Sequence, residues 1–350
     1  MTLEDGTTYK GISFGAPGTV QGEVVFNTGM VGYPETLTDP SYRGQILVLT
    51  YPLVGNYGVP GDEMDEGLSK HFESPGVQVE GLVIADLSHH YSHWSATRSL
   101  DRWLKEHDVP AIYGVDTRAI TKRLREKGTM VGGIVTGAGD PDLSLDSERN
   151  IVAEVSTREP VVYERGEKKV VLVDCGVKNN IIRAFLRRNI TVKRVPWDHD
   201  LTREDAHGII ISNGPGDPKK CGETIKNVRK LLSRNDIPIL GICLGSQILA
   251  LAAGADTYKL KYGHRSQNQP CMEAGTKRCY ISSQNHGYAV DSDTLPEDWR
   301  EWFYNVNDNT NEGLIHISKP FFGAQFHPEA SPGPDDTEFI FDMFTRRLGP

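Results

Sequence analysis

The sequence predicts an α/β protein with two domains, and three observations support this prediction. The chain has 350 residues, which is long for one hydrophobic core and natural for two. Its second half alternates short, continuously apolar runs with helical segments, as in a parallel sheet that helices cover on both faces. A polar span separates this half from the first. We therefore expect a mixed α/β domain over residues 1–140, a linker over 141–168 and a doubly wound domain with a mostly parallel sheet over 169–350.

The first half contains short runs of β-forming residues and two helical segments. Strands are expected at residues 23–26 and 45–49, and helices at 95–106 and 118–127. The second helix begins just after Asp116 and Thr117, either of which can cap it.

The second half repeats a rhythm of strand and helix. Apolar runs predict strands at 170–173, 190–195, 208–211 and 237–242, and the segments between them predict helices at 179–188, 222–233 and 244–253. Parallel strands of this kind gather functional groups at their carboxyl ends. The residues that follow each strand are therefore the first place to search for chemistry.

Composition argues against several classes of protein. The 38 Lys and Arg residues against 47 Asp and Glu residues give a net charge of −9, which disfavours a nucleic-acid partner because phosphate binding needs a concentrated positive field. The most apolar stretch, 238–255, is interrupted by glycines and falls short of a membrane span. Five cysteines without a C-x-x-C pair predict free thiols in a reducing compartment. The N-terminus has no secretory or transit pattern, so we expect a cytoplasmic protein, with a mitochondrial location left open if a transit segment precedes this chain.

The strongest local signal is Gly-Ile-Cys-Leu-Gly at residues 241–245, where a predicted strand runs directly into a helix. This arrangement is typical of a nucleophile elbow with cysteine in place of serine. Gly241 and Gly245 keep the turn free of Cβ clashes, and the helix N-terminus favours the thiolate of Cys243. The amide of Leu244 would then face a developing oxyanion. The alternative is a small buried cysteine in a glycine-rich turn.

A nucleophile needs a base, and His-Pro-Glu at residues 327–329 supplies a candidate. His327 and Glu329 lie two positions apart, so in extended chain both side chains point the same way and the carboxylate can orient the imidazole. Alone, such a triplet favours a structural role. Downstream of the elbow, in the same domain, it is the expected partner of Cys243.

Three further features carry weaker signals. The turn Gly214-Pro215-Gly216 lacks the phosphate-loop pattern, and it is either an ordinary turn or a source of backbone N–H groups for an oxyanion. His89, His90 and His93 have no carboxylate or thiol at ligand spacing, so we expect a solvated loop. Cys175 follows a strand but lacks a leading glycine, so we expect a packing residue.

Together, G-x-C-x-G-x-Q at 241–247, G-P-G-D-P at 214–218 and H-P-E at 327–329 resemble class I, triad-type glutamine amidotransferases. The first half narrows this resemblance. Segments at 22–29, 32–35, 38–42 and 114–118 look like the small subunit of carbamoyl phosphate synthetase, and those at 92–97 and 305–308 resemble the amidotransferase part of the long eukaryotic synthetase chains. The resemblance covers about residues 2–345.

The resemblance implies a role for each matching residue. Cys243 would be the nucleophile, His327 the base and Glu329 the orienting acid, with no metal site. The positions that hold glutamine fall on Ser41, Gly214, Gly216, Leu244, Gln247, Asn285, Gly287 and Tyr288. One departure is Ser246, where many members of the family have histidine. Ammonia-dependent relatives have lost the nucleophile, whereas this chain retains it.

By the same resemblance we expect the glutaminase component of a glutamine-dependent carbamoyl phosphate synthetase, which hydrolyses glutamine through a cysteine thioester to glutamate and ammonia. Its partner would be the large synthetase subunit or a fused synthetase domain, which uses bicarbonate, ATP and Mg²⁺, while this chain needs no cofactor. Arginine and pyrimidine biosynthesis both remain open as the pathway. One rival is the amidotransferase of another synthase, against which the first 140 residues argue. The other is a catalytically weak docking or regulatory module of the synthetase.

Overall fold

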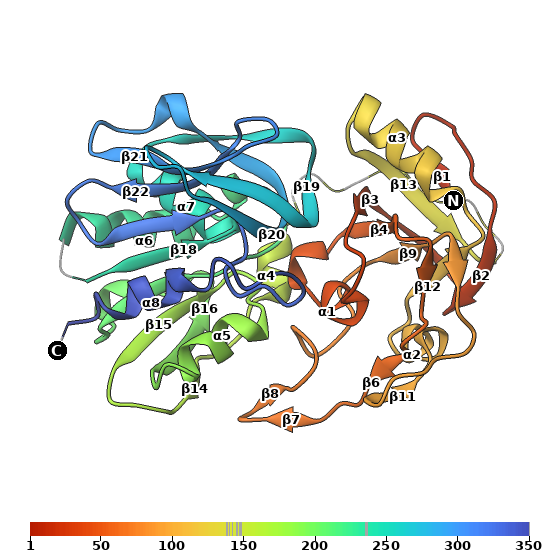
Figure 1. The fold of residues 1–350 in the computed structure, drawn as a ribbon, viewed down its shortest axis with the longest axis horizontal. Coiled ribbons are helices and arrows are strands. Elements are labelled where there is room, and N and C mark those ends of the chain that lie inside the picture. Colours follow the sequence, from red (N-terminus) through yellow and green to blue (C-terminus); the bar gives the residue numbers. More distant parts are fainter. Residues whose placement is uncertain are drawn as a thin grey trace. The chain divides into compact units, whose positions relative to one another are not determined.

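The computed structural model describes residues 1–137, 139, 141, 143–144, 146, 149–234 and 237–349. The chain forms two compact units, Met1–Arg149 and Asn150–Pro350, each built on a large sheet of its own (Figure 1). The α/β class predicted from the sequence is confirmed. Within the described residues, none of the helices combines the length and the apolar character that a membrane crossing requires.

A seven-stranded mixed sheet forms the first unit. From edge to edge its strands are β1 (Thr2–Leu3), β13 (Met130–Val135), β3 (Thr19–Asn27), β4 (Gln45–Leu49), β9 (Gly81–Val83), β12 (Pro110–Tyr113) and β2 (Ile12–Gly15). The four strands from β3 to β12 run parallel, and the flanking strands are antiparallel. β4 spans the predicted residues, whereas β3 starts earlier than predicted because β13 pairs with it from Thr19 onwards.

The helices of this unit are α1 (Tyr33–Leu37), α2 (Leu100–Glu106) and α3 (Thr117–Lys127). Asp116 caps α3 by accepting from the Ala119 N–H at 2.8 Å, which selects one of the two predicted caps. α2 begins later than predicted, because Ser99 takes the cap position and the residues before it form a short strand. Three two-stranded pairs complete the unit: β5 (Leu53–Val54) with β10 (Asp86–Leu87), β6 (Val59–Pro60) with β11 (Ala96–Arg98), and β7 (Met64–Asp65) with β8 (Leu68–Ser69).

A ten-stranded sheet forms the second unit. Its order is β14 (Val161–Tyr163), β16 (Thr191–Pro196), β15 (Lys169–Asp174), β17 (Gly208–Ile211), β18 (Ile239–Ile242), β23 (Phe321–Ala324), β22 (Asn311–His316), β21 (Trp299–Asn305), β19 (Asp256–Glu273) and β20 (Cys279–Asp291). The five strands from β16 to β23 are parallel, as the sequence predicts. The antiparallel extension from β22 to β20 was not among the predicted strands.

Helices cover both faces of the parallel strands because those strands are apolar on both sides (Figure 1). On one face, α6 (Gly222–Arg234) and α7 (Leu244–Ala253) share a core with Val171, Val173, Ile209 and Ile211. α5 (Asn179–Leu186) and α8 (Phe339–Thr345) cover the other face. There, Phe185 packs edge to face against Phe341 and Phe344, with ring centroids 5.3 and 5.8 Å apart.

Part of the span predicted as a linker, 141–168, forms regular structure. α4 (Ile151–Val155) buries Val152 in the core of the second unit, and β14 pairs with β16 at the edge of the ten-stranded sheet. Both elements are short and mostly exposed, so their sequence is polar and composition alone predicts a linker. Residues 142, 145, 147 and 148 of that span lie outside the described residues.

Candidate active site

Cys243 lies at the carboxyl end of β18, where the chain turns directly into α7. Its backbone has φ 53° and ψ −109°, a conformation that a residue other than glycine adopts only under constraint. Its N–H donates to the Ala324 carbonyl on β23 at 2.8 Å, and its own carbonyl accepts from the Ser246 N–H at 3.0 Å. These bonds hold the strained turn of a nucleophile elbow, with the first turn of a helix beside the thiol.

The two glycines of the elbow are required by close backbone contacts. A Cβ at Gly241 would lie 2.4 Å from the carbonyl oxygen of Gly245, and a Cβ at Gly245 would lie 2.0 Å from the carbonyl oxygen of Ile211 on β17. Neither position can hold a side chain unless the backbone moves. The spacing of glycines that marked this segment in the sequence therefore has a steric cause.

His327 and Glu329 follow β23 and form a buried pair. The Nδ1 atom of His327 lies 2.6 Å from Oε1 of Glu329, with side-chain exposures of 2% and 0%. Burial opposes a charged imidazole, but the negative charges of Glu329 and Cys243 outweigh it and raise the pKa of His327 well above its ordinary value. The other ring nitrogen, Nε2, has no hydrogen-bond partner among the described residues. This arrangement favours the imidazolium form of His327.

A buried lysine extends this charge cluster, and the sequence analysis did not single it out. The Nζ atom of Lys178 lies 3.1 Å from Oε1 of Glu329 and also donates to the carbonyl of Ala330. Burial disfavours the Glu329 carboxylate, but the charges of Lys178 and His327 dominate and lower the pKa of Glu329 to about 2. Lys178 lies four residues beyond the end of β15 at Asp174 and takes the N-cap position of α5. That position after a strand was the signal that could have found it.

Residues 283–288 of β20 contact both Cys243 and His327. The N–H of His327 donates to the carbonyl of Ser283 at 2.9 Å, and the two residues form an isolated β-bridge. The Sγ atom of Cys243 lies 3.6 Å from the carbonyl oxygen of Asn285. The strand β20, which is far from the elbow in the sequence, therefore lies next to the two residues in the structure.

Two glutamine side chains link this segment to the elbow. The Nε2 atom of Gln247, on α7, donates to the Tyr288 carbonyl at 2.8 Å and to Oε1 of Gln325 at 3.0 Å. The Nε2 atom of Gln325 in turn lies 3.8 Å from Sγ of Cys243. Of the predicted residues, Asn285 therefore contacts Cys243 directly, and Gln247 and Tyr288 are linked to it through Gln325, which the sequence analysis missed.

The turn after β17 holds Gly214 and Gly216. A Cβ at Gly214 would lie 2.0 Å from the carbonyl oxygen of Cys175 and 2.8 Å from Cδ2 of Leu244, so this turn packs against the first residue of α7. Gly216 has φ +85°, which favours glycine. The two sources of backbone N–H groups that the sequence analysis named are thus neighbours at the carboxyl ends of adjacent strands.

Two other positions named in the sequence analysis are Ser41 and Ser246. Ser41 belongs to the first unit, where its N–H donates to the Asp39 carboxylate at 2.9 Å, whereas the other predicted site residues all belong to the second unit. Ser246 is buried on α7, its Oγ atom has no hydrogen-bond partner among the described residues, and it faces Gly323 of β23. The hydroxyl of Ser246 therefore occupies a packing position.

The structure also bears on two weaker sequence signals, the histidines at 89–93 and Cys175. His89, His90 and His93 are exposed, and within the described residues they belong to no group of side chains close enough to share a metal ion. Cys175 is fully buried in the core of the second unit, and burial raises the pKa of its thiol. It is a packing residue, as expected.

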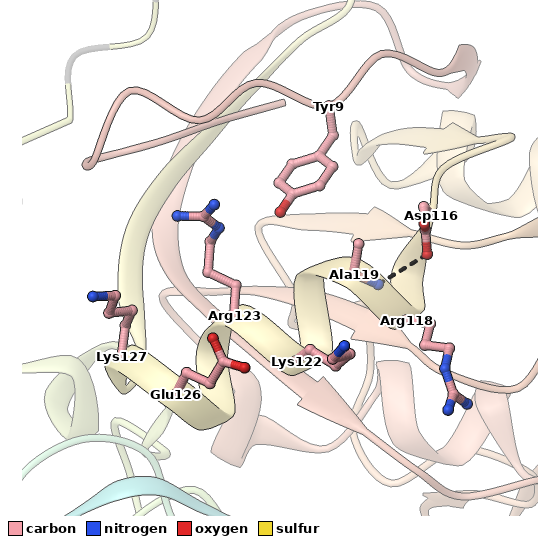
Figure 2. A pocket seen from close by; sticks show the side chains of 8 residues that line it. All are labelled: Tyr9, Asp116, Arg118, Ala119, Lys122, Arg123, Glu126 and Lys127. Carbon is pink, nitrogen blue, oxygen red and sulfur yellow. Dashed lines mark hydrogen bonds between the residues drawn. The ribbon is translucent and has the colours of Figure 1, made fainter.

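A pocket of about 470 Å³ lies in the first unit along α3 (Figure 2). Its lining consists of Tyr9, Asp116, Arg118, Ala119, Lys122, Arg123, Glu126 and Lys127. Basic side chains outnumber acidic ones, although Arg123 is paired with Asp5 at 2.5 Å. None of the predicted site residues lies in this pocket, so it is separate from the chemistry described above.

Comparisons with known proteins match both halves of the chain. Residues 171–347 match the family Glutamine amidotransferase class-I, and residues 1–134 match the family Carbamoyl-phosphate synthase small chain, CPSase domain. The chain is 51% identical over 354 residues to the carbamoyl phosphate synthase arginine-specific small chain of Aspergillus fumigatus, covering 98% of this chain and 78% of that protein.

Two longer proteins are similar to the same extent. Identity is 55% over 350 residues with the multifunctional protein CAD of Squalus acanthias, covering 98% of this chain and 16% of that protein. It is 53% over 348 residues with the mitochondrial carbamoyl-phosphate synthase [ammonia] of Homo sapiens, covering 98% of this chain and 23% of that protein. The chain thus spans less than a quarter of the length of these two relatives. By its two family matches and its identity with a small chain over most of that protein's length, the chain belongs to the carbamoyl phosphate synthase small chain family, with a class I glutamine amidotransferase domain in its second half.

Proposed function

We propose that this chain is the glutaminase component of a glutamine-dependent carbamoyl phosphate synthetase. The observation that carries the proposal is the strained Cys243 at the elbow, beside the buried pair of His327 and Glu329. Overall similarity does not distinguish glutamine from ammonia as the nitrogen source, because one relative 53% identical is named for ammonia. The thiol supports glutamine, since amide hydrolysis needs a nucleophile and the use of free ammonia does not.

The first half of the proposed reaction forms a thioester. The Sγ thiolate of Cys243 attacks the side-chain amide carbon of glutamine and gives a tetrahedral intermediate. The carbon–nitrogen bond then breaks, and His327 gives its Nε2 proton to the nitrogen, which leaves as ammonia. Glu329 holds the imidazole through Nδ1 and balances its charge, and Lys178 keeps Glu329 ionised.

The second half hydrolyses the thioester. His327, now neutral, takes a proton from a water molecule, and the resulting hydroxide attacks the acyl carbon. The carbon–sulfur bond breaks, glutamate leaves and Cys243 returns as a thiolate beside the imidazolium. In both halves the oxyanion accepts hydrogen bonds from backbone N–H groups of Leu244 and of the turn at Gly214–Gly216, as in other acyl-transfer sites.

The remaining predicted residues would hold the amino-acid end of glutamine. Gln247, Asn285, Gly287 and Tyr288 offer amide and carbonyl groups, and such groups suit a ligand that carries both an ammonium and a carboxylate. The Asn285 carbonyl lies beside the thiol, and the Tyr288 carbonyl accepts from Gln247. Ser41 is proposed for the same role. This role rests on the family resemblance of its sequence segment.

The ammonia would pass to a synthetase partner, either a large subunit or a fused synthetase domain. That partner would bind bicarbonate, ATP and Mg²⁺, while this chain works without a cofactor. The relatives' names include an arginine-specific small chain and a multifunctional protein, so the carbamoyl phosphate would supply arginine or pyrimidine biosynthesis. We propose a cytoplasmic location, which subcellular fractionation tests against a mitochondrial one.

The proposal is tested by glutamine hydrolysis with the purified chain, alone and with its synthetase partner. The wild type should release glutamate and ammonia in equal amounts. Cys243→Ser should release neither while keeping the wild-type unfolding temperature, because an alcohol is a far weaker nucleophile at neutral pH. Cys175→Ser, the matched control, should keep its activity. A wild-type chain without glutaminase activity even beside its partner would contradict the proposal and would favour a docking or regulatory module.

A further inference from the structure

A second buried cluster of ionisable side chains lies in the antiparallel part of the sheet. It consists of His264 on β19, His286 on β20 and Glu312 on β22, with ligand atoms within 4.8 Å of one another. Glu312 is 0% exposed, and both histidines are buried. A carboxylate so deeply buried needs compensation from charge or hydrogen bonds.

His264 supplies that compensation. Its Nδ1 atom lies 3.1 Å from Oε1 of Glu312, and its Nε2 atom lies 2.8 Å from Oδ2 of Asp308. Both ring nitrogens therefore face carboxylates, an arrangement that holds a proton on each. Burial opposes this charge, but the hydrogen bonds to Asp308 and Glu312 and their charges raise the pKa of His264 to about 9.

Three contacts connect the cluster to the side chain of Gln284 and the backbone of Tyr288. The amide oxygen of Gln284 lies 3.0 Å from Nδ1 of His264 and 3.1 Å from Nε2 of His286. The Nδ1 atom of His286 then donates to the Tyr288 carbonyl at 2.8 Å. The same carbonyl accepts from Gln247 on the elbow helix.

A further contact links the cluster to the elbow through Gln325. The N–H of Gln325 donates to the backbone carbonyl of Glu312 at 2.9 Å, and the side chain of Gln325 lies 3.8 Å from the Cys243 Sγ atom. Glu312 is thus linked to the site through β20 and through the residue after β23. It touches none of the reacting groups itself.

We propose that Glu312 and His264 are positioning residues that fix the strand on which glutamine binds. The inference rests on the proposed function and deepens it. The ion pair holds Gln284 and His286, and through them the backbone from Asn285 to Tyr288. Under the proposed function, this backbone binds the amino-acid end of glutamine. Loss of the ion pair between Glu312 and His264 should therefore weaken glutamine binding and leave the chemical step at Cys243 nearly intact.

The test compares Glu312→Gln, which keeps the shape and removes the charge, with the exposed control Glu297→Gln. We expect Glu312→Gln to raise KM for glutamine about tenfold and to change kcat less than about threefold. His264→Gln should have a similar effect, and the double variant should be no worse than either single one, because the two residues act as a unit. Asp308→Asn, at the exposed edge of the cluster and therefore safe for folding, should raise KM about twofold to threefold.

A binding measurement separates this inference from the proposed function. Calorimetry with glutamine in the Cys243→Ser background should show about tenfold weaker binding when Glu312→Gln is added. Unchanged KM and unchanged affinity in an otherwise active enzyme would overturn the inference and leave the glutaminase intact. A fall in kcat for Glu312→Gln and His264→Gln, with KM unchanged, would overturn the inference too. A stoichiometric metal ion in the purified wild type would contradict a protonated His264 and make the cluster a metal site.

Discussion

The parallel and antiparallel strands of the ten-stranded sheet contribute different groups to the site. The parallel strands β15, β18 and β23 are followed by Lys178, Cys243 and His327, side chains that carry an amine, a thiol and an imidazole. The antiparallel strands contribute backbone carbonyls at 285 and 288 and the buried cluster behind them. Under the proposed function, the catalytic groups and the groups that bind glutamine would therefore come from different parts of one sheet. Variants in the first part should change kcat, and variants in the second should change KM.

The largest effect on the parallel side, apart from removal of the nucleophile, is expected for His327→Asn. Both proton transfers pass through this ring, so kcat should fall by about 10³-fold to 10⁴-fold. KM should stay close to the wild-type value. His199→Asn is the matched control, since His199 also pairs with a glutamate, at 2.8 Å, away from the site residues. A rise in KM with kcat preserved would assign His327 to substrate binding. It would contradict the distinction between the parallel and the antiparallel strands.

Glu329→Gln should cost less, about 10-fold to 100-fold in kcat, because Glu329 orients and supports the imidazolium. It should also move the alkaline limb of the pH–rate profile to lower pH. A raised folded-state pKa means that His327 keeps its proton, and the associated stability, until the pH rises through that value. Removal of the carboxylate charge lowers the pKa, so the active imidazolium is lost sooner. An unshifted alkaline limb would show that another group governs it.

Lys178→Met should lower kcat about tenfold and destabilise the fold by about 3 kcal/mol, because it leaves the buried Glu329 charge with one partner fewer. Thermal unfolding and steady-state kinetics check the two effects. Lys193→Met removes a partly buried pair with Glu204 at 2.8 Å, less buried than the pair of Lys178, and serves as the control, with a smaller loss of stability and normal kcat. If the control and Lys178→Met behaved alike, the lysine would be structural only.

The smallest effect is expected for Ser246→Ala. The Ser246 hydroxyl has no hydrogen-bond partner among the described residues, so its loss should change stability by less than about 1 kcal/mol and kcat by less than about twofold. Differential scanning calorimetry and the glutaminase assay measure both. A tenfold fall in kcat would show that this position takes part in the reaction, contrary to its packing environment.

The same contrast explains how much could be predicted from the sequence. The elements β4, β17 and α7 coincide with their predicted bounds. Continuous apolar runs and glycine turns are local signals, each contained in a few consecutive residues. The elbow and the pair at 327 and 329 could be found for the same reason. Lys178 was missed because one lysine after a strand carries little signal by itself. Its partner, Glu329, is distant in the sequence and comes near only in the folded chain.

The antiparallel part was not predicted because its pattern is not local. β19 and β20 are long and polar, with register shifts between Lys259 and His264 and between Ser266 and Gln269. Those shifts decide which side chains face inward. His264, His286 and Glu312 are each separated by more than twenty residues, and no spacing rule joins them. Residues 283–288 entered the prediction only through the family resemblance.

The central claim is that Cys243 forms a covalent bond with the substrate, and acid quenching during glutamine turnover tests it most directly. Mass spectrometry of the digested enzyme should show a glutamyl thioester on the peptide that contains Cys243, absent from Cys243→Ser and increased in His327→Asn if hydrolysis of the thioester slows more than its formation. The peptides that contain Cys175, Cys221, Cys271 and Cys279 should remain unmodified. Steady glutamine hydrolysis with an adduct on another cysteine, or with Cys243→Ser as active as the wild type, would contradict the account.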